Sequence, residues 1–168
     1  MKQIVKQMLG LLIGGILLIS CNNQNQKSVK EENKSGLFEV YDSIKAAEYG
    51  ADEYGMKKYV MAFLKRGPNR EMDEVKSNEI QMAHLSNINR MAEQGKLILA
   101  GPFFDNGDLR GIYIFNVKSI AEAEELTNTD PAIIAGVLVM ELKEWYGSAA
   151  LMSINELHKT LEKKNIIE

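Results

Sequence analysis

Apolar and polar residues alternate in blocks between Tyr59 and Tyr146, and the blocks predict two kinds of regular structure. Short apolar runs predict strands, and longer segments with apolar residues at helical spacing predict helices. The predicted strands span residues 59–65, 96–101, 112–117 and 137–146, and the predicted helices span residues 71–94 and 119–126. Gly67-Pro68 should close the first strand, and Gly95 should end the first helix. The order β-α-β-β-α-β is typical of a ferredoxin-like α+β domain, with an antiparallel sheet and both helices on one face.

The predicted strands are apolar on both faces. In the first strand Tyr59, Met61 and Phe63 point to one face, and the residues between them, which are also apolar, point to the other. The helices can cover only one of these faces. A second copy of the sheet would cover the other, which predicts a two-fold homodimer. A C-terminal helix, or the segment before the first strand, could cover part of that face instead.

The segments outside the domain of residues 59–146 differ from it in composition. Residues 21–36 are almost entirely polar, so we expect a flexible tether. Residues 37–58 carry scattered aromatics and are interpreted as a lead-in that packs against the domain. Residues 147–168 contain an amphipathic pattern that predicts an extra C-terminal helix.

Residues 1–20 have the pattern of a signal peptide. Two lysines precede an apolar run of about a dozen residues, which is shorter than the roughly 20 that span a bilayer. The run ends in Leu18-Ile19-Ser20-Cys21, which resembles a bacterial lipobox, and Cys21 is the only cysteine of the chain. We therefore expect cleavage before Cys21 and lipidation of Cys21, which would anchor the protein to a membrane. A single-span anchor, or a buried helix with an unmodified thiol, is the alternative.

A lipid on Cys21 would tether the folded part in the bacterial cell envelope, facing the periplasm. Asn22 is not the aspartate that retains many lipoproteins in the inner membrane, which favours the outer membrane. The formal net charge is −3, and losing Lys2 and Lys6 with the leader makes the charge more negative. This argues against nucleic acid and against an anionic lipid surface as partners.

Four stretches of the domain resemble the YCII-related (YciI-like) family. They are YVMAFLKRGPN, AHLSNINRMAEQGKLILAGPF, LRGIYIF and TDPAIIAG, followed by a closing strand with Trp145. The resemblance implies a dimeric α+β barrel of ferredoxin-like protomers, related in architecture to muconolactone isomerases. It also implies an active-site pair at His84 and Asp130. One characterised type in the family is a dehydrochlorinase that acts on a chlorinated hydroxyquinol, but most members have no assigned reaction.

The chemistry of a His-Asp pair suits proton transfer. Imidazole titrates near neutral pH, and a carboxylate on its second nitrogen fixes the tautomer and stabilises the imidazolium. Both residues also have structural interpretations. His84 lies at the flank of an apolar helix stripe, where it could simply pack, and Asp130 could be a turn residue or a cap before Pro131. Pro131 favours an extended backbone at Asp130, which can aim the carboxylate away from its own loop.

Other residues are candidates for ligand binding. Gly101 and Pro102 could leave room for a ligand at the end of the second strand, or could simply terminate that strand. Arg110 and Tyr113 could contact an anionic or aromatic ligand, with a surface salt bridge and sheet packing as their respective alternatives. His158 is interpreted as a solvated residue of the C-terminal helix. Two histidines without metal-ligand spacing predict no metal site, and no dinucleotide or phosphate-binding motif predicts a cofactor.

These patterns leave two hypotheses for function. In the first, the protein is a cofactor-independent isomerase or lyase, in which His84, oriented by Asp130, transfers protons on a small-molecule ligand. In the second, it is a non-catalytic ligand-binding or structural module of the cell envelope, and His84 only packs.

Overall fold

The computed structural model describes residues 40–166. The predicted leader, Cys21 and the predicted tether lie outside the described residues. Among the residues that are described, no helix is long and apolar enough to cross a membrane.

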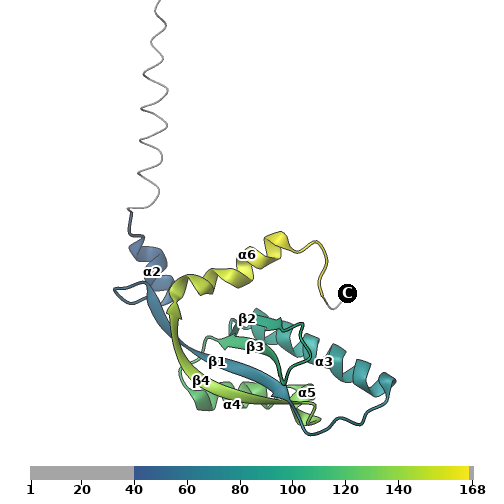
Figure 1. Ribbon diagram of the computed structural model, residues 1–168. Coiled ribbons are helices and arrows are strands. Elements are labelled where there is room, and N and C mark those ends of the chain that lie inside the picture. The colour runs from purple at the N-terminus through teal and green to yellow at the C-terminus, as the bar shows by residue number, and fades with distance from the viewer. Residues whose placement is uncertain (1–39, 167–168) are drawn as a thin grey trace, which may run out of the picture. The chain divides into compact units, whose positions relative to one another are not determined.

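The centre of the domain is a four-stranded antiparallel sheet with the strand order β2-β3-β1-β4 (Figure 1). Its strands are β1 (Met56–Arg66), β2 (Leu97–Pro102), β3 (Leu109–Phe115) and β4 (Leu138–Ser148). Helix α3 (Glu74–Glu93) connects β1 to β2, and helices α4 (Ile120–Thr127) and α5 (Pro131–Ile134) lie between β3 and β4. The predicted ferredoxin-like α+β order is therefore confirmed, with α5 as an additional short helix.

Local signals in the sequence explain where the helices begin and end. Asp73 caps α3 by accepting a hydrogen bond from the Lys76 amide, and Ser119 caps α4 through the Glu122 amide. Gly95 follows α3 with a φ of 66°, in the left-handed region that glycine adopts without strain.

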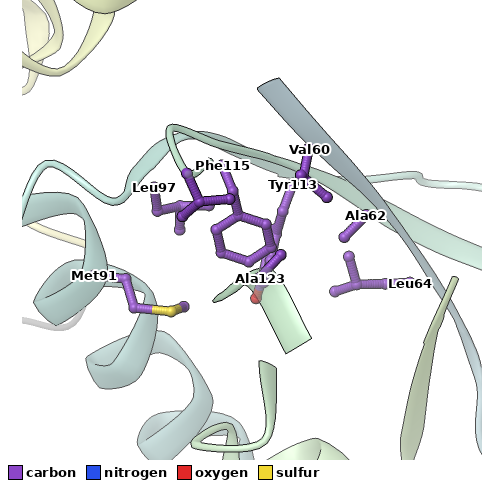
Figure 2. Packing of buried hydrophobic residues seen from close by; sticks show 9 residues of the cluster. Val60, Ala62, Leu64, Met91, Leu97, Tyr113, Phe115 and Ala123 are labelled. Atoms are coloured by element: carbon purple, nitrogen blue, oxygen red, sulfur yellow. The ribbon is translucent and has the colours of Figure 1, made fainter. Parts of the chain in front are cut away.

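One face of the sheet packs against α3 and α4 and forms the main core (Figure 2). Alternate residues of β1 and β3 point into it, as the two-residue period of a strand requires. The buried members are Val60, Ala62, Leu64, Met91, Leu97, Tyr113, Phe115, Val117 and Ala123. Because Met91 comes from α3 and Ala123 from α4, this core fixes both helices on the same face.

The C-terminal segment covers part of the opposite face. Tyr59, Ile98 and Ile114 are buried there beneath the 3-10 helix η1 (Ala149–Ser153) and the start of α6 (Ile154–Leu161). The predicted C-terminal helix is therefore confirmed. Before β1, the lead-in segment contains a short helix, α2 (Ser43–Tyr49), which contacts η1.

The cover of this second face is incomplete. Met61, Phe63 and Ile112 remain half-buried, and beside them Lys65 forms an ion pair with Glu141. The predicted homodimer would cover these apolar side chains, and it stays a prediction. Sedimentation of the chain at the mass of a monomer would contradict it.

The end of β1 makes a close backbone contact with the turn between α5 and β4. The Gly67 amide donates to the Val137 carbonyl at 2.8 Å, and the Asn69 amide donates to the Gly136 carbonyl at 2.9 Å. A Cβ atom on Gly67 would lie 2.1 Å from the Gly136 carbonyl oxygen. Only glycine allows this approach, which joins the end of β1 to the segment that follows Asp130.

We expect Gly67→Ala to lower the free energy of unfolding by about 1–3 kcal/mol, because the new methyl group would push two backbone segments apart. Urea denaturation followed by circular dichroism measures the change. Gly101→Ala is the matched control, since a Cβ atom at Gly101 meets no other atom within 4 Å. Equal denaturation midpoints for the two variants would contradict the close contact.

Candidate functional site

His84 lies on the side of α3 that faces the sheet, and its side chain is almost fully buried. Only 8% of the residue is exposed. The ring nitrogen Nδ1 lies 2.9 Å from Oδ1 and 2.8 Å from Oδ2 of Asp130. An ionised carboxylate can only accept hydrogen bonds, so this contact places a proton on Nδ1. The two side chains that the family resemblance pairs therefore do meet.

Asp130 has no solvent exposure at all. Besides the contact with His84, its Oδ1 accepts a hydrogen bond from the Ala132 amide at 2.9 Å, which makes Asp130 the N-cap of α5. Pro131 occupies the first turn of α5, where its missing N–H costs nothing. The sequence left a cap and a dyad partner as alternatives for Asp130, and the structure shows that the carboxylate makes both contacts.

Tyr113 completes a chain of three side chains. Its hydroxyl oxygen lies 3.3 Å from Nε2 of His84, and the two rings are nearly parallel, with centroids 6.3 Å apart. Burial, and after it the negative charge of Asp130, raises the pKa of Tyr113 far above its usual range. The phenol therefore keeps its proton and donates toward Nε2. Tyr113 also packs edge-on against Phe115, so the predicted sheet packing is present together with the contact to the dyad.

A second polar cluster fixes the loop that carries Asp130. Asn87 lies one helical turn after His84, and its Oδ1 accepts hydrogen bonds from Nη2 of Arg90 at 2.7 Å and from Oγ1 of Thr129 at 3.2 Å. Thr129 directly precedes Asp130. This cluster therefore ties the loop before α5 to the helix that carries His84. Single polar residues on a helix have no recognisable pattern, so the sequence does not predict this cluster.

His84 and Tyr113 line a cleft of about 1180 Å³, whereas Asp130 does not reach it. His84 therefore contacts a buried carboxylate and also lines this cleft. Gly101, Pro102 and Arg110 line the same cleft, and their role in ligand binding stays a prediction. A Cβ atom at Gly101 would meet no other atom within 4 Å.

The side chain of Arg110, for which a surface salt bridge was the alternative interpretation, forms hydrogen bonds with backbone carbonyls. It lies at a bulge of β3, where Leu64 is paired with Gly111 and Lys65 with Leu109. Its Nη1 donates to the Asp105 carbonyl at 2.7 Å and to the Gly107 carbonyl at 3.4 Å, and both acceptors belong to the β2–β3 loop.

The structure adds residues to the cleft that the sequence analysis did not select. Arg66, at the end of β1, and Arg70, in the segment before α3, both line the cleft. His158, expected to be solvated, has an exposed side chain that forms part of the cleft wall and lies 3.8 Å from Glu162. The basic character of residues 64–70 was the signal that could have identified the first two. Within residues 40–166 no cluster of three or more His, Cys, Asp or Glu side chains is suited to hold a metal ion.

We expect His84 to carry its proton on Nδ1 when it is neutral, because Asp130 can only accept. Long-range ¹H–¹⁵N correlation spectra of the imidazole distinguish the two tautomers. In Asp130→Asn the carboxamide can donate to Nδ1, so the proton should move to Nε2. The same spectrum from both proteins would contradict this account of the pair.

Comparison with known proteins places the domain among relatives. The YCII-related domain matches residues 59–146. The uncharacterised protein YjpA of Bacillus subtilis (strain 168) is 31% identical over 62 residues, a match that covers 37% of this chain and 71% of YjpA. Among solved structures, 5-chloro-2-hydroxyhydroquinone dehydrochlorinase (TftG) from Burkholderia phenoliruptrix AC1100, in complex with 2,5-dihydroxybenzoquinone, is 19% identical with a TM-score of 0.40. That match covers 51% of this chain and 92% of TftG. The family match and the similarity to YjpA lead to one conclusion: this chain belongs to the YCII-related domain family.

Proposed function

We propose that this protein is a cofactor-independent enzyme in which His84 is the general acid and base, acting on a small molecule bound in the cleft. The observation that carries the proposal is the environment of His84. Both oxygens of a fully buried carboxylate contact Nδ1, and the ring borders an open cleft. A histidine that only fills space in a core needs neither feature.

The geometry suits reactions that move a proton to or from carbon. With the proton on Nδ1, Nε2 carries the lone pair that can accept a proton from the ligand. Asp130 would stabilise the imidazolium that forms. In an isomerisation Nε2 would return the proton at another carbon, and in an elimination a leaving group would depart with its bonding electrons.

Tyr113 has a defined part in this proposal. Its hydroxyl is 3.3 Å from Nε2, which is long for an O–H···N hydrogen bond. Such contacts are often loose before a substrate binds. A ligand could therefore displace this contact, while the phenol, which keeps its proton, donates a hydrogen bond to an oxygen of the ligand.

A non-catalytic binding module is the second candidate, and one observation favours it. Tyr113 already occupies Nε2, so the three side chains can equally form a closed structural network. In that case replacement of His84 would lower stability but would not alter ligand affinity.

We also propose that the mature protein begins at Cys21 and is held by a lipid in the bacterial cell envelope, facing the periplasm. The support is the apolar run before Leu18-Ile19-Ser20-Cys21 and the absence of any other cysteine from the sequence.

The test of the catalytic proposal follows exchange of carbon-bound hydrogen with solvent. The full-length chain is incubated near pH 7 in D₂O with a panel of unsaturated lactones and cyclic enones, and ¹H NMR records the loss of C–H signals. We expect His84→Gln to slow exchange by about 100-fold or more, in line with the usual contribution of general base catalysis. Gln is preferred to Ala because its carboxamide can donate to Asp130, whereas an unpaired buried carboxylate would destabilise the fold by about 3–5 kcal/mol.

Ser86→Ala is the control for this experiment, because Ser86 is exposed on the same helix and lies outside the cleft. Equal exchange rates in wild type and His84→Gln would exclude His84 as the base. Binding of a panel member without exchange, and with the same affinity in His84→Gln, would support the binding module instead.

The anchoring proposal has a separate test. We expect Cys21→Ser to move the protein from the membrane fraction to the soluble fraction after cell lysis, because the thiol that accepts the lipid is gone. Mass spectrometry of the wild-type N-terminus should show an acylated Cys21. Continued membrane association of Cys21→Ser, with residues 1–20 still attached, would indicate an uncleaved anchor.

A further inference from the structure

The cleft has a charge opposite to that of the whole chain. The protein has a formal net charge of −3. Basic side chains nevertheless outnumber acidic ones along the cleft: the basic ones are Arg66, Arg70, Arg110, Lys159 and Lys164, and the acidic ones are Glu93 and Glu162. A concave surface with this bias attracts anions, because low-dielectric walls concentrate the field of the charges that line them.

The rest of the cleft wall is largely apolar. Leu85 and Ile88 of α3, Leu99 of β2 and Ile154 of α6 contribute to it. The volume of about 1180 Å³ exceeds the range of roughly 300–1,000 Å³ that is usual for drug-sized ligands. A ligand that fills such a space has a substantial apolar body.

Among the basic residues of the cleft, the side chains of Arg70, Lys159 and Lys164 take part in none of the ion pairs found within residues 40–166, and two of these three belong to the C-terminal segment. Arg66 and Arg110 donate to backbone carbonyls of the β2–β3 loop. Glu162, which lies between the two lysines in the sequence, is directed to His158.

This segment is fixed beside the domain at two points. Nδ2 of Asn155 donates to the Leu97 carbonyl at 2.8 Å, and Nδ2 of Asn89 donates to Oδ1 of Asn165 at 3.1 Å. The first contact joins the start of α6 to β2, and the second joins the residues after α6 to α3. Both lysines lie between these contacts in the sequence.

We propose that the cleft binds an organic anion with an apolar body, and that Lys159 and Lys164 hold its charged group. The proposal takes the cleft beside His84 as the ligand site of the proposed function, and names the class of ligand. Lys159 lies in the last turn of α6, where a positive charge stabilises the negative end of the helix dipole. This effect could account for the presence of Lys159 without any ligand. Lys164 lies beyond the end of α6, so the effect on the helix does not account for it.

A matched pair of ligands tests the charge requirement. Isothermal titration calorimetry compares 2-naphthoate with the neutral 2-naphthamide on the full-length chain at low salt. We expect 2-naphthoate to bind more tightly, and its affinity to fall with added NaCl while that of 2-naphthamide does not. Equal affinities of the two ligands, or no binding of either, would overturn the proposal.

Variants of the C-terminal segment test the assignment to the two lysines. We expect Lys159→Gln/Lys164→Gln to weaken 2-naphthoate binding on the order of three- to tenfold, which is the range for two exposed charge contacts. Lys76→Gln/Lys163→Gln changes the net charge equally at positions outside the cleft, and it should retain wild-type affinity. Equal losses in both double variants would overturn the assignment, as would a loss in Arg70→Gln without one in Lys159→Gln/Lys164→Gln.

The two proposals can fail separately. Calorimetry measures binding without turnover, so an inactive His84 would leave the preference for 2-naphthoate intact. Conversely, exchange of carbon-bound hydrogen that depends on His84 but occurs only with neutral lactones would support the catalytic proposal. The same result would contradict the proposal of an anionic ligand.

Discussion

Asp130 is a carboxylate with no access to water, and the arrangement around it follows from the cost of burying its charge. An isolated buried carboxylate is strongly unfavourable, so each of its oxygens needs a donor. The structure supplies Nδ1 of His84 and the Ala132 amide. The first donor requires α3 to present His84 at this depth, and the second requires α5 to begin directly after Asp130. The position of two helices is therefore tied to one side chain.

The same requirement makes His84 a candidate for chemistry. A histidine held by a buried carboxylate has a fixed ring orientation and a defined tautomer. The hydroxyl of Tyr113 lies at the other nitrogen, and the cleft begins there. Three buried side chains from α3, β3 and the loop before α5 thus connect the carboxylate of Asp130 to the wall of the cleft. A hydrogen-bonded cluster of Asn87, Arg90 and Thr129 also joins α3 to the loop that carries Asp130.

Most of the fold could be predicted from the sequence because the strands and helices have clear local patterns. The β-α-β-β-α-β order, the end of α3 at Gly95 and the cap at Ser119 all follow from residues that lie close together in the chain. The cleft could not be predicted in this way. Its walls combine residues 64–70 with the segment after α6, and no local pattern links them.

The candidate pair itself depended on a family resemblance. Residues 84 and 130 are 46 positions apart, and spacing alone gives no reason to join them. The structure also shows why the alternatives for Asp130 could not be separated from sequence. An aspartate directly before Pro131 suits both a cap and a dyad partner, and here one carboxylate does both.

The long pairing between β1 and β4 has a consequence for how the protein folds. These strands lie side by side from Met56 opposite Ser148 to Arg66 opposite Leu138, so the central strand of the sheet gains its second neighbour only from the far end of the domain. Contacts between residues so distant in sequence slow folding, because a large loop must close before they form. The sheet can be completed only after residue 148 has become available. Until then the sheet of a nascent chain lacks the edge strand β4, and one side of β1 has no hydrogen-bonding partner.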